Sequence, residues 1–254
     1  MVVADNKNNK PKITTIDPEE IEKFSKMADD WWNVEGKFKP LHQFNPARLN
    51  YFRRKICDYF NNDQKSLSPF KNLTVIDIGC GGGLISEPFA RLGADVTAID
   101  ALEKNIKIAS LHAEKSGLKI NYLCSSIEEI ADKEQQFDVV LALEIIEHVA
   151  DVQHFISCCA KLVKKDGLLF VSTINRTASS LALAKITAEY ILRWLPINTH
   201  QWKKFLKPSE VNFYAQNNHL EIVEIKGFFY NLFKRIWQES ENINVNYSIL
   251  FKKI

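Results

Sequence analysis

Residues 75–83 read Val75-Ile76-Asp77-Ile78-Gly79-Cys80-Gly81-Gly82-Gly83, an apolar run that passes directly into a loop of glycines. A run of β-branched residues is typical of a strand buried on both faces, and glycines let the backbone turn tightly and approach a ligand closely. Asp100 ends the next apolar stretch, where a carboxylate can accept hydrogen bonds from both hydroxyls of a ribose. Together these signals predict a nucleotide-like cofactor on an α/β sheet.

The spacing of the glycines distinguishes between two such cofactors. An NAD site takes the pattern G-x-G-x-x-G and directs a helix N-terminus at a pyrophosphate, whereas Gly79, Gly81 and Gly83 alternate. Asp77 would repel a pyrophosphate but would attract the cationic amino-acid end of S-adenosylmethionine. The loop resembles motif I of class I S-adenosylmethionine-dependent methyltransferases, and Asp100 resembles their second-strand acid.

The composition is that of a soluble globular protein. The 254 residues suffice for one α/β domain, and a formal charge of +2 gives no reason to expect bulk binding to nucleic acid. The five cysteines form no C-x-x-C pair, so we predict neither a disulfide framework nor a zinc site, and expect a cytoplasmic location. No stretch approaches the ~18 apolar residues of a spanning helix, so membrane contact would be peripheral, at the inner face.

Alternating patterns from residue 73 onward predict a doubly wound, Rossmann-like sheet of seven mainly parallel strands in a single domain over 13–254. We expect a disordered lead-in at 1–12 and a helical lid at 13–65. Strands are predicted near 73–78, 95–99, 119–123, 137–143, 168–173, 219–226 and 246–253. Helices are predicted near 83–92, 101–115, 126–131 and 151–164, with a turn at 165–167 and another helix starting at 207–210.

Two N-terminal helices are predicted from proline positions. Asp17-Pro18 supplies a cap and a first-turn proline for a helix that runs to Trp31 or Trp32, and Asn45-Pro46 repeats the device. The adjacent tryptophans between them predict either a lid over the site or ordinary core packing.

The segment Leu143-Glu144-Ile145-Ile146-Glu147-His148-Val149 follows the fourth predicted strand at the cofactor edge of the sheet. If the segment is helical, Glu144, Glu147 and His148 share one face. Such a set can bind a divalent cation, or His148 can act as a general base that the acids orient. A plain strand-to-helix junction with capping acids is the third interpretation.

Further segments resemble the ubiquinone biosynthesis O-methyltransferase family, and the match covers most of the chain. They are Trp31-Trp32-x-x-Glu35-Gly36-x-Phe38-Lys39-Pro40-Leu41-His42, Asn45-Pro46-x-Arg48, Glu144 to Val149, Thr173-Ile174-Asn175-Arg176, Thr199-His200 and Lys204-Phe205-Leu206-Lys207-Pro208. The family usually has proline after the His-Val pair, where this chain has Ala150. One missing proline loosens a turn and leaves the neighbouring side chains in place.

The resemblance implies methylation of phenolic hydroxyls of polyprenylated intermediates, namely 2-polyprenyl-6-hydroxyphenol and 3-demethylubiquinol. It implies contacts to S-adenosylmethionine from Arg48, Gly79, Asp100 and Leu143, to which the loop pattern adds Asp77, Gly81 and Gly83. It also implies Mg²⁺ at Glu144, Glu147 and His148. The expected partners are the polyprenylated substrate and other ubiquinone biosynthesis proteins, with no nucleic acid.

The chemistry that remains for the protein is deprotonation of the phenol. A phenol near pKa 10 costs about 4 kcal/mol to ionise at pH 7, which a chelating metal or a base would offset. We favour metal polarisation, with His148 as ligand or base.

A helical insertion over 176–206 would serve the substrate. Its apolar surface and the cations Arg193, Lys203, Lys204 and Lys207 suggest docking on anionic lipid, or else a lid helix packed on the core. Alternative functions are a class I methyltransferase with another acceptor, a non-catalytic cofactor-binding module and, more distantly, a Rossmann dehydrogenase.

Overall fold

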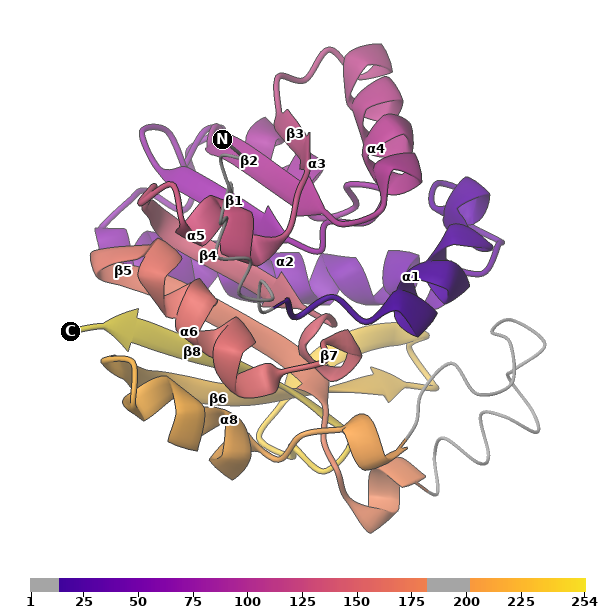
Figure 1. Cartoon of the computed structure of the whole chain (residues 1–254). Helices are drawn as coiled ribbons and strands as arrows, with labels where there is room; N and C mark the ends of the chain where they lie inside the picture. The colour runs from indigo at the N-terminus through magenta and orange to yellow at the C-terminus, as the bar shows by residue number, and fades with distance from the viewer. Residues whose placement is uncertain (1–13, 182–201) are drawn as a thin grey trace, which may run out of the picture.

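The computed structural model describes residues 14–181 and 202–254, which are built around one eight-stranded sheet (Figure 1). The strand order is β3-β2-β1-β4-β5-β8-β6-β7. The strands are β1 (Thr74–Ile78), β2 (Asp95–Asp100), β3 (Asn121–Cys124), β4 (Phe137–Leu143), β5 (Val163–Ile174), β6 (Leu220–Asn231), β7 (Ile236–Ser240) and β8 (Asn246–Lys253). The first five pair in parallel, whereas β8 is antiparallel to both β5 and β6, and β7 is antiparallel to β6.

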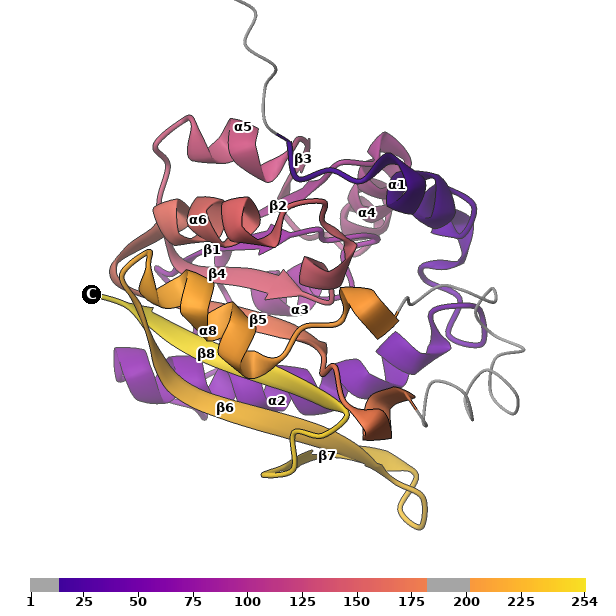
Figure 2. The same cartoon turned by 60° about the horizontal axis from the view of Figure 1, so that its bottom comes forward.

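Helices cover both faces of the sheet (Figures 1 and 2). On one face lie α5 (Ile127–Ala131), α6 (Val152–Leu162) and α8 (Pro208–Gln216), and on the other lie α2 (Lys39–Phe60), α3 (Ser86–Arg91) and α4 (Glu103–Lys115). Successive residues of β1 point to opposite sides, so that Val75 joins one core and Ile76 the other. This burial on both faces explains the continuous apolar run that β1 shows in the sequence.

The predicted fold class is confirmed, with one strand more than predicted. The additional strand, β7, is an edge strand of half-buried and exposed residues, so the apolar alternation that marks a strand is weak there. The turn predicted at 165–167 is wrong, because β5 already begins at Val163. Its pairing with β4 shifts register between Phe137 and Val139, and Asp166 has a φ of 59°. Residues 165–167 therefore form a bulge-like irregularity within β5 and do not form a separate turn before the strand.

The N-terminal helices start and end differently from the prediction. Helix α1 (Pro18–Ser25) begins as expected, with the Asp17 carboxylate accepting a hydrogen bond from the Glu19 amide at 3.0 Å. It ends before the tryptophans, and a short 3-10 helix, η1 (Ala28–Asp30), follows. Helix α2 begins at Lys39, seven residues before the predicted first helical residue Pro46, with Pro40 in its first turn and Pro46 inside it. Asn45 does not cap the helix: it is buried and accepts a hydrogen bond from Arg48.

The topology fixes which residues can meet. Because β1, β2, β3, β4 and β5 run in parallel, their carboxyl ends lie at one edge of the sheet, and the segments that follow them converge there. Those segments include the glycine loop, Asp100 and Glu144. None of the helices in the described part of the chain combines the length and apolar character that crossing a membrane requires.

Candidate cofactor and catalytic site

The glycine loop after β1 turns directly against the end of β2. The amides of Gly79 and Cys80 both donate to the Ile99 carbonyl, at 2.9 and 3.0 Å. Gly79 has a φ of 70°, and a Cβ on it would lie 2.7 Å from Ile145. This position therefore requires glycine both for its backbone conformation and for the close approach of the segment after β4.

Asp100 at the end of β2 is tied to this loop. Its two carboxylate oxygens accept hydrogen bonds from the Gly81 amide at 3.0 Å and the Leu102 amide at 2.8 Å. Burial raises the pKa of Asp100, and these hydrogen bonds oppose that rise. Each carboxylate oxygen has two lone pairs, so both keep acceptor capacity toward a ligand that carries two hydroxyls.

A cavity of about 300 Å³ lies beside Asp100. It is lined by the carboxyl ends of β2 and β3 and by the segment before α1, including Thr14, Ile16, Ala101, Cys124 and Glu128. The sequence prediction did not identify these residues. Cys124 ends β3, so the rule that ligands bind beyond the carboxyl ends of parallel strands was the signal that could have pointed to the cavity.

Asp77 lies inside the site, and its carboxylate accepts a hydrogen bond from a neutral side chain. Its side chain is 3% exposed, and the hydroxyl of Ser86 donates to it at 2.6 Å. Burial raises the pKa of Asp77 to about 6, although the Ser86 hydrogen bond and the charge of Arg48 favour the ionised form. A buried carboxylate of this kind is suited to receive a cationic group.

The two tryptophans pack on the glycine loop. Trp31 stacks on Phe38 with ring centroids 3.7 Å apart, and a Cβ on Gly81 would lie 2.3 Å from the Trp31 ring. The Trp32 indole donates to the Gly82 carbonyl at 2.9 Å. Trp31 and Phe38 belong to a small apolar cluster that is separate from the two cores of the sheet. The tryptophans therefore cover the loop and are not part of the main cores.

Arg48 of α2 connects the N-terminal helices to the segment after β4. It is 2% exposed and donates to Glu144 at 3.1 Å. Glu144 follows Leu143, the last residue of β4. Burial and repulsion from Glu147 raise the pKa of Glu144, while the charge of Arg48 opposes that rise.

Glu147 and His148 lie in a short 3-10 helix, η2 (Ile146–His148), and point to different partners. The Thr173 hydroxyl donates to one oxygen of Glu147 at 2.8 Å, and the other oxygen is buried without a hydrogen-bond partner among the described residues. The His148 Nδ1 atom lies 3.0 Å from a carboxylate oxygen of Glu20 in α1. Although burial opposes ionisation, hydrogen bonds from His148, Lys23 and Lys204 lower the pKa of Glu20.

The predicted three-residue metal set does not converge in this arrangement. Glu144 binds Arg48, Glu147 binds Thr173, and His148 faces Glu20. Within residues 14–181 and 202–254, no group of three or more His, Cys, Asp or Glu side chains is placed to hold a metal ion. Among the described residues, the unpartnered oxygen of Glu147, close enough to Glu144 to raise the pKa of that residue, is a feature that suits a cation.

Comparison with known proteins places this site in a broader class. A family model described as a methyltransferase domain matches residues 76–171. The magnesium protoporphyrin IX methyltransferase of Synechocystis PCC 6803 with bound SAH has the same fold, with a TM-score of 0.66, 19% identity, and coverage of 93% of this chain and 100% of that one. The same enzyme with bound SAM gives a TM-score of 0.63 at 16% identity, covering 96% and 100%. The fold is that of class I S-adenosylmethionine-dependent methyltransferases, and the family model that matches is a methyltransferase domain.

Closer similarity is found among proteins named ubiquinone biosynthesis O-methyltransferase. The one from Bartonella quintana is 52% identical over 240 residues, covering 94% of this chain and 97% of that protein. The one from Rhizobium leguminosarum bv. trifolii is 50% identical over 240 residues, covering 94% and 95%. The chain belongs to the ubiquinone biosynthesis O-methyltransferase family.

Proposed function

We propose that the chain transfers the methyl group of S-adenosylmethionine to phenolic hydroxyls of polyprenylated intermediates of ubiquinone biosynthesis, 2-polyprenyl-6-hydroxyphenol and 3-demethylubiquinol. The observation that carries the proposal is the identity of about half of all residues to proteins of that name over nearly the whole chain. The site agrees with it, because the buried Asp77 and the half-buried Asp100 lie on either side of the glycine loop and an acidic and histidine-containing segment follows at the same sheet edge.

The cofactor side of the site is assigned to residues of β1, β2 and the loops after them. Asp100 takes the ribose hydroxyls, the cavity at Ala101 and Cys124 takes the adenine, and Asp77 attracts the amino group. Gly79, Gly81 and Gly83 are assigned to backbone contacts with the cofactor, although Ile145, Trp31 and Tyr122 pack against these glycines in the free chain. Arg48 and Leu143 are assigned to the same side from α2 and β4. S-adenosylmethionine supplies an electrophilic sulfonium methyl when it is bound.

The acceptor side is assigned to the segment after β4. His148 is assigned as the base that takes the phenolic proton, and the contact of its Nδ1 to Glu20 holds the ring orientation. Glu144 and Glu147 orient the acceptor hydroxyls. Trp31 and Trp32 on the glycine loop exclude water from the transfer, so the part of the predicted 13–65 lid that covers the site is the segment around these tryptophans, whereas α2 packs on the sheet. A single domain over 13–254 is part of the same proposal.

Mg²⁺ remains a prediction to be tested and is not used in any step of this mechanism. The free oxygen of Glu147 beside Glu144 supports a cation held by two carboxylates and substrate oxygens, which is a usual Mg²⁺ arrangement. The carboxylate of Glu20 on the His148 ring suits a general base and a metal ligand alike, since it orients the imidazole in either role.

Peripheral membrane contact at the inner face, and contact with other ubiquinone biosynthesis proteins, complete the proposal. Residues 182–201 of the predicted insertion, including Arg193, lie outside the described residues, as does the lead-in at 1–12. Of the insertion's cations that are described, Lys204 pairs with Asp17 at 3.0 Å and Glu20 at 3.1 Å. Lys204 is thus assigned to holding α1, and the lipid contact must use other residues.

The test is methyl transfer from labelled S-adenosylmethionine to a short-chain polyprenyl catechol and to the matching demethylubiquinol, with Mg²⁺ and then with EDTA. We expect methylation of both acceptors. Loss with EDTA and recovery with Mg²⁺ would support the metal, and indifference to EDTA would leave His148 as the sole base. No transfer by folded protein that binds S-adenosylhomocysteine would refute the assigned acceptor.

A further inference from the structure

The turn between β6 and β7 exposes two large apolar side chains. Leu232 is 78% exposed and Phe233 is fully exposed. Phe229 on β6 and Ile236 on β7 are each nearly half exposed, at 45% and 48%. Turns normally carry Gly, Pro, Asn, Asp or Ser, so a Leu-Phe pair at the tip of a hairpin calls for a reason other than turn formation.

The hairpin holds this tip in a defined conformation. The Asn231 side-chain oxygen accepts hydrogen bonds from the amides of Phe233 at 3.1 Å and Lys234 at 3.0 Å. The inner face of the hairpin packs on α2, where Phe44 contacts the rings of Phe228 and Trp237 at 5.2 and 4.6 Å. The exposed pair is therefore presented by a supported turn, which protrudes from the body of the protein in Figure 2.

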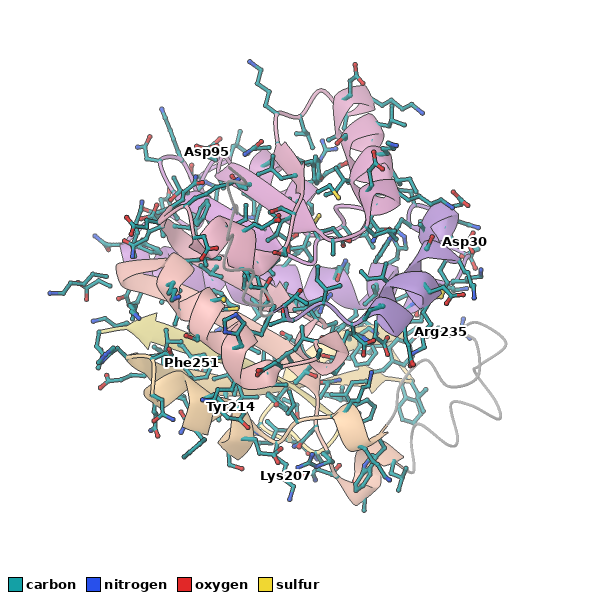
Figure 3. All side chains as sticks on the ribbon, in the orientation of Figure 1. Asp30, Asp95, Lys207, Tyr214, Arg235 and Phe251 are labelled. Atoms are coloured by element: carbon teal, nitrogen blue, oxygen red, sulfur yellow. The ribbon has the colours of Figure 1, made fainter. Side chains whose placement is uncertain are left out.

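The tip lies at the edge of the sheet that carries the candidate site. Strand β8 is antiparallel to both β5 and β6, so β6 runs parallel to β4 and β5, and its carboxyl end at Asn231 shares their edge. Figure 3 shows Arg235 on the opposite side of the molecule from Asp95, where β2 begins. Arg235 lies on the same side as Asp30, which directly precedes Trp31.

Two cations complete the tip. Lys234 and Arg235 follow Phe233 directly, both are exposed, and neither forms an ion pair with another described residue. Apolar side chains at a protruding tip with adjacent cations match the chemistry of an interface with anionic headgroups above and acyl chains below. A narrow tip presents little of the roughly 800 Å² per partner that a stable protein–protein interface buries.

We propose that the turn at residues 232–235, here called the apolar tip, inserts Leu232 and Phe233 into the surface of an anionic bilayer while Lys234 and Arg235 contact lipid phosphates. This inference rests on the proposed function, because a polyprenylated acceptor resides in a bilayer. Insertion of the tip turns the carboxyl edge of the sheet toward the membrane, so the ring of the acceptor has only to leave the interface to reach the site.

The test is flotation of the full chain with phosphatidylcholine vesicles, with and without phosphatidylglycerol. We expect the double variants Leu232→Ser/Phe233→Ser and Lys234→Glu/Arg235→Glu each to lower the bound fraction about tenfold. The matched controls lie away from the tip. Leu67→Ser/Phe213→Ser removes side chains 91% and 63% exposed, and Lys65→Glu/Lys71→Glu makes the same charge change on the loop before β1. Both controls should bind as the parent chain does.

Methyl transfer to a short-chain acceptor in solution separates this inference from the proposed function, because no tip variant should change it. Vesicle binding that the tip variants retain would overturn the inference and leave the methyltransferase intact. Absence of vesicle binding by the parent chain would overturn it as well. A dimer in solution that the tip variants dissolve would also overturn it, by showing that the tip contacts a second copy.

Discussion

We expect a single buried carboxylate, Asp77, to set how cofactor binding depends on pH. Its pKa is raised to about 6 in the free protein, whereas a bound ammonium group favours the ionised form. Below pH 6 a proton must leave Asp77 on binding, so the dissociation constant for S-adenosylhomocysteine should rise about tenfold per pH unit as the pH falls. Above pH 6 the dissociation constant should not change with pH.

Titration calorimetry of S-adenosylhomocysteine between pH 5 and pH 8 measures this dependence. The variant Asp77→Asn should bind more weakly at pH 8 and lose the dependence near pH 6. A slope that survives in Asp77→Asn would assign the titration to another group and contradict the role given to Asp77.

A second side-chain prediction concerns Glu20, the partner of His148. Glu20→Gln keeps the size of the side chain but removes the charge that faces the His148 ring and orients it. We expect kcat to fall roughly tenfold to a hundredfold, within the contribution of a general base, with little change in cofactor affinity. The control is Lys23→Gln, which removes another partner of Glu20 and leaves the contact to His148.

Steady-state kinetics with both substrates, together with the pH profile of kcat, distinguish the positioning role of Glu20 from a merely structural one. A structural role would lower thermal stability and leave the profile of the remaining activity unchanged. Equal losses in Glu20→Gln and Lys23→Gln would count against positioning of His148.

The sequence contains the local parts of the site but not its long-range pairs. The glycine loop, Asp100 and the Glu144 to His148 segment are each visible because their residues lie close together in the chain. Glu20 and His148 are 128 positions apart in the sequence. Ser86, which donates a hydrogen bond to Asp77, is the first residue of α3, and no sequence motif predicts that this helix begins there. Such contacts depend on how the elements pack, so spacing in the sequence does not reveal them.

Among the elements, the parallel strands were predictable and the N-terminal helices were less so. β1 and β4 are buried on both faces, and burial leaves an apolar run in the sequence. The predicted start of helix α2 is wrong because Asn45-Pro46 resembles a helix start, whereas Phe44, before the proline, is buried in the same core as Tyr51 and Phe52 and belongs to the same helix. Tertiary burial outweighed the local cost of Pro46.

The cover formed by Trp31 and Phe38 should behave as a separate unit. Trp31→Ala removes a large side chain whose loss from a packed site costs about 3–5 kcal/mol, and the small cluster around it has few other contacts to hold it. We expect amide protection to fall in the segment from Pro18 to Phe38 while β4 keeps its protection, as hydrogen exchange followed by mass spectrometry would show.

Val34→Ala is the control for this experiment, because Val34 is 57% exposed and lies in the same segment. It should leave the exchange pattern unchanged. Uniform loss of protection across the sheet in Trp31→Ala would show that the cover is part of the main core and would remove the basis for a lid.

The whole molecule combines the sheet edge proposed to bind the cofactor, a cover over that edge and a hairpin at the same side. The parallel strands bring the glycine loop, Asp100 and Glu144 together at their carboxyl ends, and the antiparallel β8 returns β6 to that edge. The sheet therefore sets the direction from which both cofactor and acceptor approach.

Cofactor binding should stabilise the folded molecule as a unit. A ligand that binds only the folded state at a concentration of about one hundred times its dissociation constant adds about 2.7 kcal/mol to the free energy of unfolding. For a chain of this size that amounts to a rise of roughly 5–10 °C in the unfolding temperature. We expect this rise with S-adenosylhomocysteine and none with NADH, because the alternating glycines and Asp77 disfavour a pyrophosphate. Asp100→Asn should reduce the rise, since it weakens the acceptor of the ribose hydroxyls, and a rise with NADH alone would reassign the site to a dinucleotide.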